Sequence, residues 1–400
     1  MGLFDDDFYS SKISKWERRR LMQERWPASY DTRRLLQVLL LTSILALIIF
    51  MVIISLIFSG SEERAPIPQV SPSIQSEQVS IVDIVQKLKP AIVSIVSIQE
   101  KFALEDQVTS IGSGIIYYKK GSAAKVVTNY HVIEAADSIE VVLSNGERLN
   151  AELVGSDMLT DLAILKINAE KIESIAEFGN SDLLQEGEAV IAIGHPFGLG
   201  YSPTFTLGII SSLERIIPIS LGMDGITDWE MKLLQTDAAI NQGNSGGALV
   251  NMEGKVIGIN SMKVAQSGVE GLGFAIPSND ALININEIEA YGKVRRPYLG
   301  VATVDLKIYN QSEDFSELIT LPEDVKAGII VLEALGPAAE AGIQTNDVII
   351  TLDGKVITST LELRKYLYTE KKISDPLRVE FYRNGEKYMV DLILSEAPGK

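Results

Sequence analysis

Residues 138–154 read SIEVVLSNGERLNAELV, and this stretch shows the pattern that decides the fold of the central part of the chain. Apolar and polar residues alternate on both sides of Asn145-Gly146, as they do in strands that bury one face. Asn-Gly is a preferred pair for the two-residue turn that joins antiparallel strands. The stretch therefore predicts a β-hairpin.

Short β-branched runs of the same kind continue through residues 91–277. Around ten strands without long helices between them predict an antiparallel barrel or sandwich, because a doubly wound sheet needs a helix after almost every strand. Ser80 and Asp83 form a capping-box pattern at the start, and a helix over residues 278–291, ended by Gly292, is predicted at the end. We expect one all-β domain over residues 80–292. The runs outside the hairpin are AIVSIVSI, GIIYY, KVVTN, LAILKI, AVIAIG, TLGIISSL, GALVN and KVIGINSMKV.

Residues 296–396 have a different character. Strands are predicted in YLGVATVDL, GIIVLEAL and NDVIITLDG, and the capping box from Ser359 to Glu362 predicts a helix to about residue 368. A last hairpin is expected around Asn384-Gly385. This stretch predicts a small α+β module of a size that folds alone.

Residues 35–58 form an uncharged apolar run of 24 residues that contains one Gln. Such a run spans about 30 Å of hydrocarbon with some tilt. A cleaved signal peptide is the alternative, but its apolar region is shorter, roughly 7–15 residues. We expect a retained single-pass anchor in the cell membrane.

The charges beside this run predict its orientation. Residues 1–34 hold eight basic residues, with Arg33 and Arg34 next to the run, whereas only Arg64 follows closely on the other side. The positive-inside rule therefore places this tail in the cytoplasm and the rest of the chain outside. Residues 59–79 are rich in Ser, Pro and Glu and predict an extended linker.

The composition excludes several classes of site. The chain has no cysteine, and therefore no thiol nucleophile, disulfide or cysteine-ligated metal. Its two histidines cannot supply a three-histidine zinc site. The net charge of −17 argues against nucleic acid as a partner. We expect no metal and no cofactor.

The first candidate catalytic residue, Ser245, lies in the pentapeptide GNSGG at 243–247. Small, flexible neighbours let a serine sit on a tight turn with its hydroxyl exposed. The backbone N–H groups of Gly243 and Ser245 can then point toward one spot, as an oxyanion hole requires. A plain glycine-rich turn before a strand is the alternative.

A serine hydroxyl needs a base to take its proton, and the chain has two imidazoles. His131 stands in KVVTNYHVIEAA, where a predicted strand turns into a short helix, which is a rigid mount for a base. A capping or surface role is its alternative. His195 lies in IGHPFGLG, a loop dense in Gly and Pro, and fits a turn role better.

A carboxylate that holds the histidine in one tautomer completes such a site. Asp161 precedes the apolar strand LAILKI, which would place its carboxylate beside the core. Asp157, four residues earlier, is the rival and falls in a more polar turn. Asp161 is the preferred candidate.

The chain order His131, Asp161, Ser245 is that of the chymotrypsin-like arrangement and differs from those of α/β-hydrolases and subtilisins. The segments TNYHVI, TDLAILKI and GNSGGALVN resemble motifs of the HtrA (high-temperature-requirement A) serine proteases, and the resemblance extends over residues 80–395. It implies a serine endopeptidase with two antiparallel β-barrels, a C-terminal PDZ domain, these three residues as triad, and Gly243 with Ser245 as oxyanion hole. Relatives more often read IGNPFG at IGHPFG, so no catalytic role carries over to His195.

Two positions near the candidate nucleophile refine this expectation. Asn244 stands where the digestive relatives have an aspartate that pairs with a newly freed N-terminus, and an amide cannot form that ion pair. We therefore expect activation by loop ordering or ligand binding, without propeptide cleavage. Ala239, at the expected pocket base, offers no carboxylate to select Lys or Arg. Together with Ile240, Ile259 and Asn260 it predicts a modest apolar pocket and cleavage after small or medium aliphatic residues.

Residues Tyr298, Leu299, Gly300 and Val301 stand in the place of the carboxylate-binding loop of a PDZ domain. The resemblance implies that their backbone N–H groups receive the terminal carboxylate of a peptide. The peptide would add as a strand beside the helix that begins near Thr360. A module that only braces the protease is the alternative.

The resemblance also implies a biological role. It predicts an ATP-independent protease that degrades unfolded or damaged exported proteins, with unfolded polypeptides and peptide C-termini as partners. It further predicts a homotrimer or a larger assembly. Two other hypotheses about function stay open. One is a regulatory protease for one membrane-associated signalling protein, and the other is a non-proteolytic peptide-binding scaffold or chaperone.

Overall fold

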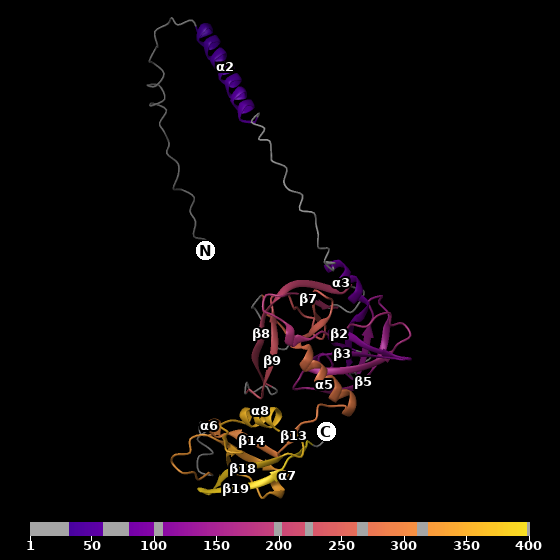
Figure 1. Cartoon of the computed structure of the whole chain (residues 1–400), viewed down its shortest axis with the longest axis vertical. Coiled ribbons are helices and arrows are strands. Elements are labelled where there is room, and N and C mark those ends of the chain that lie inside the picture. Colours follow the sequence, from indigo (N-terminus) through magenta and orange to yellow (C-terminus); the bar gives the residue numbers. More distant parts are fainter. Residues whose placement is uncertain are drawn as a thin grey trace, which may run out of the picture. The chain divides into compact units, whose positions relative to one another are not determined.

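The computed structural model describes residues 32–58, 80–99, 107–195, 202–220, 227–261, 271–309 and 319–397 (Figure 1). The chain divides into two compact units, Met1–Ser76 and Glu77–Lys400. The predicted linker, residues 59–79, lies outside the described residues, as do residues 1–31 of the predicted tail.

Helix α2 (Thr32–Phe58) is the described element of the first unit. Its window Leu36–Ser55 has a mean hydropathy of 3.0, and all of its side chains are exposed. By length and composition this helix can cross a membrane, although a signal sequence near an N-terminus meets the same criteria.

The predicted hairpin at Asn145-Gly146 belongs to a closed antiparallel barrel of six strands, paired in the order β1-β2-β3-β6-β5-β4. Ile139 lies opposite Ala151 across the hairpin. The turn is one residue longer than the predicted two-residue turn, because Leu143 N donates to the Glu147 carbonyl at 2.8 Å and leaves residues 144–146 in the loop, where Gly146 has a φ of +87°. Closure leaves no free sheet edge. The strands are β1 (Ile92–Gln99), β2 (Gln107–Lys120), β3 (Ala123–Thr128), β4 (Ser138–Val142), β5 (Arg148–Asp157) and β6 (Leu162–Asn168).

A second closed barrel of six strands follows, in the order β10-β11-β12-β9-β8-β7. The expected all-β domain is thus confirmed as two barrels, which decides between the barrel and sandwich alternatives. The strands are β7 (Ala189–Gly194), β8 (Thr204–Ile219), β9 (Trp229–Thr236), β10 (Ala248–Asn251), β11 (Val256–Asn260) and β12 (Gly273–Pro277).

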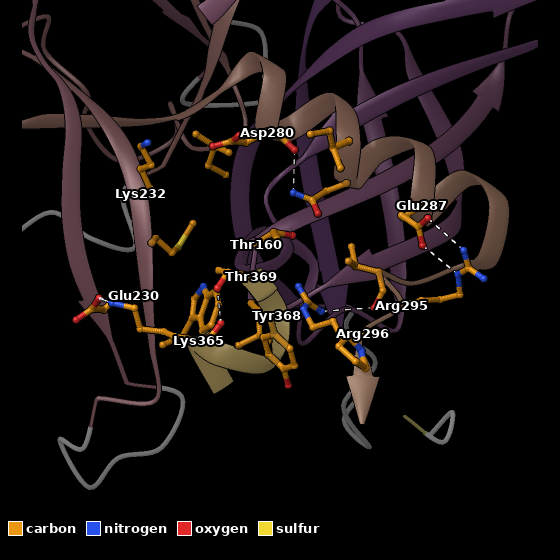
Figure 2. A pocket seen from close by; sticks show the side chains of 18 of the residues that line it. Thr160, Glu230, Lys232, Asp280, Glu287, Arg295, Arg296, Lys365, Tyr368 and Thr369 are labelled. Carbon is orange, nitrogen blue, oxygen red and sulfur yellow. Dashed lines mark hydrogen bonds and ion pairs between the residues drawn. The ribbon is translucent and has the colours of Figure 1, made fainter. Parts of the chain in front are cut away.

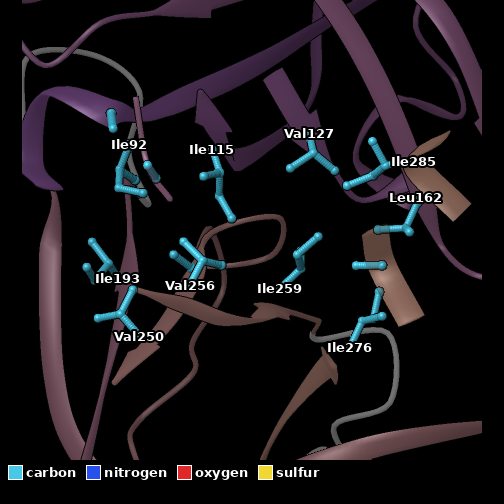
Figure 3. Packing of buried hydrophobic residues seen from close by; sticks show 14 of the residues in the cluster. Ile92, Ile115, Val127, Leu162, Ile193, Val250, Val256, Ile259, Ile276 and Ile285 are labelled. Carbon is cyan, nitrogen blue, oxygen red and sulfur yellow. The ribbon is translucent and has the colours of Figure 1, made fainter. Parts of the chain in front are cut away.

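One hydrophobic cluster joins the two barrels (Figure 3). Ile115 and Leu162 enter it from the first barrel, and Ile193 and Ile259 enter it from the second. Each aliphatic side chain buried in this way contributes roughly 1.5–3 kcal/mol. The barrels are therefore held to each other by the same kind of packing that fills each of them.

Short helices cover this double barrel. Ser80 caps α3 (Ile81–Leu88), as its capping pattern predicts, by accepting a hydrogen bond from Val82 N at 3.2 Å. Helix α5 (Ser278–Tyr291) ends at Gly292 in the left-handed conformation, φ +74°, as predicted. The other short elements are η1 (Lys89–Ala91), α4 (Tyr130–Ile133) and η2 (Ser181–Leu183).

The C-terminal module is a six-stranded sheet packed with helices and a separate two-stranded pair. Helix α8 (Thr360–Glu370) begins after Ser359, whose hydroxyl accepts from Glu362 N at 3.2 Å, and runs two residues beyond the predicted end. Strand β14 (Val301–Asp305) is an edge strand of the sheet. The other elements are α6 (Leu306–Tyr309), β15 (Ile329–Ala334), α7 (Gly336–Glu340), β16 (Val348–Leu352), β17 (Lys355–Val356), β18 (Pro376–Arg383) and β19 (Glu386–Ile393), with β13 (Pro297–Tyr298) paired to β20 (Ser395–Glu396).

Ion pairs connect the C-terminal module to the double barrel. From α8, Arg364 donates to the Asp228 carboxylate at 2.9 Å, and Lys365 lies 2.7 Å from Glu230. The rings of Trp229 and Tyr368 are 5.5 Å apart. The second barrel therefore meets the helix beside which a peptide is expected to bind.

Candidate active site

His131 and Asp161 form a hydrogen-bonded pair at one end of the first barrel. His131 is on α4, directly after β3, and Asp161 lies between β5 and β6. The imidazole Nδ1 is 2.9 Å from Asp161 Oδ1 and 2.8 Å from Oδ2. The His131 backbone N–H also donates to Oδ1, at 3.1 Å. Two atoms of one residue thus contact the same carboxylate, which fixes the position of the imidazole ring.

The backbone of Asp161 is strained, and its surroundings hold it in place. Its φ of +56° lies in the left-handed region, which is unfavourable for a residue with a side chain. Its carbonyl accepts hydrogen bonds from Tyr130 N at 3.1 Å and from Asn129 Nδ2 at 2.9 Å. Its side chain is fully buried. These contacts direct the carboxylate toward His131.

The rival carboxylate, Asp157, has different partners. It forms a two-point ion pair with Arg296, at 2.6 and 2.8 Å, and accepts from the Thr160 hydroxyl at 2.8 Å. Burial by itself would raise the pKa of Asp157, but the hydrogen bonds and charge of Arg296, together with Thr160, hold that pKa below its ordinary value. The geometry therefore pairs Asp161, and not Asp157, with His131.

Ser245 lies on a tight loop at the start of β10. Gly243 and Gly246, on either side, have φ of +93° and +81°, so both occupy the region that glycine adopts without strain. A Cβ atom at Gly246 would lie 2.2 Å from the Ser113 carbonyl oxygen. The loop therefore needs glycine at position 246 both for its conformation and for its close packing.

Contacts between the barrels bring the two halves of the site together. Gly112 lies between them, since a Cβ atom there would be 2.6 Å from the Val132 side chain and 3.1 Å from the Ser245 carbonyl oxygen. Ser261, directly after β11, donates to Asp161 Oδ2 at 3.0 Å. Asp161 of the first barrel thus depends on a hydroxyl of the second.

Sequence reasoning missed Ser261, although its hydroxyl contacts the carboxylate directly. The residue stands at the end of an ordinary strand, 100 positions after Asp161. Nothing in its immediate neighbours indicates that contact. Only the docking of the two barrels brings these residues together.

The four predicted pocket residues lie in different surroundings. Ala239 is exposed, and its carbonyl accepts from Thr206 Oγ1 at 2.9 Å. Ile240 packs on Gly273, where a Cβ atom would lie 2.9 Å from Ile240 Cδ1. Ile259 is fully buried in the cluster between the barrels. Asn260 is also fully buried, and its amide donates to two carbonyls, those of residues 193 and 248.

The other histidine, His195, is buried at the end of β7. Its backbone N–H donates to Ser113 Oγ at 2.7 Å. The Asp161 carboxylate is bonded to His131 and Ser261 instead. The structure therefore associates the backbone of His195 with Ser113, and residues 196–200 of the predicted loop lie outside the described residues.

The predicted PDZ loop, residues 298–301, connects β13 to the edge strand β14. Gly300 has a φ of +90°, and its carbonyl accepts from Leu335 N at 2.7 Å. The Leu299 carbonyl accepts from Ala338 N at 3.0 Å. Thr303 on β14 and Thr360 at the start of α8 share a hydrogen bond of 3.0 Å. The loop is thus held firmly, beside a strand edge that α8 flanks.

A cleft of about 1060 Å³ lies between the second barrel, α5 and α8, and the triad candidates do not line it (Figure 2). Its charged side chains neutralise one another: Arg295 pairs with Glu287 at 3.1 Å, and Lys365 pairs with Glu230 at 2.7 Å. The cleft therefore presents no field of a single sign and is separate from the site around Ser245.

Two families match the chain. Residues 112–259 match a family described as a trypsin-like peptidase domain, and residues 297–394 match the PDZ domain. The serine protease Do-like HtrA of Bacillus subtilis (strain 168) is 40% identical over 342 residues, which cover 82% of this chain and 76% of that protein. The serine protease Do-like HtrB of the same strain is 42% identical over 331 residues, covering 79% of this chain and 71% of that protein.

Solved structures agree with these matches. The serine endoprotease from Yersinia pestis is 34% identical with a TM-score of 0.56, over 80% of this chain and 98% of that one. The HtrA-type protease AlgW with decapeptide is 32% identical with a TM-score of 0.59, over 80% of this chain and 100% of that one. Both the predicted resemblance and the predicted double barrel with one PDZ domain are confirmed. The chain belongs to the HtrA-type serine proteases and is a serine endopeptidase.

Proposed function

We propose that this endopeptidase is anchored in the cell membrane and degrades unfolded or damaged exported proteins. Ser245 is its nucleophile, His131 its general base, and Asp161 the residue that orients the base. The observation that carries the assignment is the 2.8 Å hydrogen bond between His131 Nδ1 and the buried Asp161 carboxylate. It leaves His131 Nε2 as the ring atom that accepts a proton.

In the proposed reaction, His131 Nε2 takes the hydroxyl proton of Ser245 while the serine oxygen attacks the scissile carbonyl carbon. The backbone N–H groups of Gly243 and Ser245 stabilise the negative charge that develops on the carbonyl oxygen. The C–N bond then breaks, and His131 returns the proton to the leaving amine. Water releases the acyl group from Ser245 by the same steps.

Replacement of the nucleophile tests this proposal. We compare the full-length chain with Ser245→Ala in mild detergent and follow the degradation of fluorescently labelled, unfolded casein. Loss of degradation in the variant, with an unchanged melting temperature, supports the assignment. Equal degradation by both forms contradicts it. If neither the wild-type chain nor Ser245→Ala degrades casein but both still bind peptide, the result would favour the hypothesis of a non-proteolytic scaffold.

Cleavage is proposed to follow small or medium aliphatic residues. The packing of Ile240 on Gly273 supports a shallow apolar pocket, and Ala239 brings no charge to it. A peptide library incubated with the full-length chain gives the preference at the cleaved bond. Preferential cleavage after Lys or Arg would contradict this proposal.

The PDZ domain is proposed to bind peptide C-termini at Tyr298, Leu299, Gly300 and Val301. The edge strand β14 and its flanking helix α8 support addition of a peptide as an extra strand. A similar protease, AlgW, has a solved structure with a decapeptide. Peptides with a free C-terminus should bind more tightly than their amidated forms in fluorescence anisotropy, and equal affinities would contradict the proposal.

The membrane anchor is proposed to be α2, with the N-terminus in the cytoplasm. Its 27 residues and its exposed apolar side chains support this, as do the basic residues that precede it. In intact spheroplasts, added protease should digest the part beyond residue 80 and spare an N-terminal tag. A mature protein that begins after residue 58 would instead identify a signal sequence.

Assembly into a homotrimer or a larger oligomer is proposed from family membership. Sedimentation of the full-length chain in detergent measures the number of subunits. A single subunit over the working concentration range would contradict the proposal.

The proposed role in quality control has a separate test, which compares the proteins degraded in cells with and without this protease. Many substrates would support general quality control, and a single substrate would support regulation of one signalling protein.

A further inference from the structure

A buried serine of the first barrel contacts the nucleophile loop of the second. Ser113 lies on β2 and is fully buried. Its backbone N–H donates to the Ser245 carbonyl at 2.7 Å, and its hydroxyl donates to the Gly243 carbonyl at 2.6 Å. One residue therefore binds the main chain at both positions assigned to the oxyanion hole.

Ser113 is itself held in place by further contacts. Its carbonyl accepts from Thr128 Oγ1 at 2.7 Å, which ties β2 to β3. Its hydroxyl oxygen accepts from the His195 backbone N–H at 2.7 Å. Because the hydroxyl accepts from one side, its proton is directed to the Gly243 carbonyl on the other. The donor is thus oriented before any substrate arrives.

We propose that Ser113 is a positioning residue that keeps the oxyanion hole in its working conformation. This inference rests on the proposed role of Ser245 and goes beyond it. The hydroxyl of Ser113 fixes the peptide unit between Gly243 and Asn244, which lies between the two N–H groups that bind the oxyanion. When that unit is fixed, both N–H groups keep their directions.

The conformation of Gly243 explains why such a contact is needed. Gly243 has a φ of +93° and no side chain to restrict its rotation. The N–H of the following peptide unit donates to the Asn241 carbonyl at 2.9 Å, within the same loop, so Ser113 is the contact that ties this unit to a barrel strand. An oxyanion hole acts through N–H groups that are oriented in advance. A hydrogen bond from a rigid barrel strand supplies the restriction that the glycine itself lacks.

Ser94 provides a matched control in the same barrel. It is also fully buried, and it lies directly opposite Ser113 in the pairing of β1 with β2. Its hydroxyl donates to the Gly112 carbonyl at 3.4 Å and contributes no hydrogen bond to residues 243–245 among those that the structure describes. Ser94→Ala therefore removes a buried hydroxyl next to Ser113 without releasing the nucleophile loop.

The test compares Ser113→Ala, Ser94→Ala and Ser245→Ala in the full-length chain in detergent, with a fluorogenic peptide that the wild-type protein cleaves. We expect Ser113→Ala to lower kcat by roughly 10- to 100-fold, because one lost oxyanion-hole donor costs about 10²–10³-fold. KM should stay within about twofold, since ground-state binding does not use the oxyanion hole. Ser94→Ala should change neither constant by more than about twofold.

A peptide boronic acid of the same sequence supplies a second readout. It forms a tetrahedral adduct with a serine nucleophile and so resembles the transition state. Ser113→Ala should weaken its binding by about the same factor as it lowers kcat/KM. Wild-type kcat and boronate affinity in this variant would overturn the proposal, as would losses of the same size in Ser94→Ala.

The outcomes also separate this inference from the assignment of the nucleophile. If Ser245→Ala stays active, the proposed catalytic site is wrong. If Ser245→Ala is inactive but Ser113→Ala is not impaired, only the positioning role fails. Should Ser113→Ala not fold, Ser113→Cys decides, because a thiol is a weaker donor of similar shape. A lower kcat with unchanged KM then supports the proposal, and a wild-type kcat overturns it.

Discussion

The two barrels support their parts of the proposed active site in different ways. In the first, Asp161 is a strained residue that hydrogen bonds of its own barrel, together with one from Ser261 of the second barrel, hold in position. In the second, Ser245 stands between two glycines whose conformations are easily reached. The carboxylate–histidine pair is therefore held mainly by its own barrel. The loop around Ser245 has internal hydrogen bonds, such as that from Asn244 N to the Asn241 carbonyl at 2.9 Å, and is also held by Ser113 of the other barrel.

The largest expected effect comes from a change in the pair formed by Asp161 and His131. Asp161→Asn should lower kcat by about 10⁴-fold, because the amide favours the wrong tautomer of His131. Asp157→Asn, four residues earlier, is the control and should lower the melting temperature but leave kcat nearly unchanged. Casein degradation and thermal melting measure both. Similar losses of kcat in the two variants would remove the distinction between the carboxylates.

The next largest effect on kcat is expected from the loop around Ser245. Gly246→Ala places a Cβ atom 2.2 Å from the Ser113 carbonyl oxygen and 2.4 Å from Thr128 Oγ1, so the loop must move. We expect kcat to fall by at least about 100-fold, as when an oxyanion-hole donor is lost. Gly146→Ala has a similar φ, +87°, but open space around it. Gly146→Ala should therefore cost only about 1 kcal/mol of stability. A loss of kcat in Gly146→Ala as large as that in Gly246→Ala would contradict this prediction.

A smaller effect probes the contact between the barrels. Ser261→Ala removes the hydroxyl that donates to Asp161 Oδ2. A hydrogen bond to a charged group contributes about 1.5–3 kcal/mol, so kcat should fall roughly 10-fold as the carboxylate loses part of its support. Ser278→Ala is the control, because that buried hydroxyl donates to a neutral carbonyl at 2.9 Å, that of Gly179. An unchanged kcat in Ser261→Ala would show that the first barrel holds Asp161 unaided.

The smallest expected effect is on stability. Arg296→Ala leaves Asp157 without its cation and should lower the free energy of unfolding by about 2 kcal/mol near pH 7. Because the pKa of Asp157 is lowered in the folded state, this contribution is present above the ordinary carboxyl pKa. It is lost as the pH falls through the folded value.

Denaturant unfolding of both forms at several pH values measures this dependence. Arg295→Ala is the neighbouring control, since the ion pair of Arg295 with Glu287 lies at the surface, where solvent screens it, and should contribute less than the pair of Arg296 with Asp157. A difference between wild type and Arg296→Ala that grows on acidification would contradict the role of Asp157.

The sequence was most informative where the controlling interactions are local. Asn145-Gly146, Ser80 and Ser359 act on residues within a few positions, so the hairpin and the helix starts could be predicted from their neighbours alone. The predicted pocket, by contrast, depends on packing between distant strands. Ile259 and Asn260 follow one another on a strand, but both are fully buried in the closed barrel. Which side chains face a pocket depends on how the strands pair around the barrel.

The sequence by itself determined the family, the order of the candidate triad and the presence of an apolar span, because motifs, spacing and composition are properties of the chain. Tertiary structure decided that Asp161, and not Asp157, pairs with His131. It also showed that Ser261 and Ser113 each reach from one barrel to a proposed active-site residue of the other, Asp161 and Gly243. These contacts join residues about 100 or more positions apart, so they exist only after the two barrels pack on their shared core.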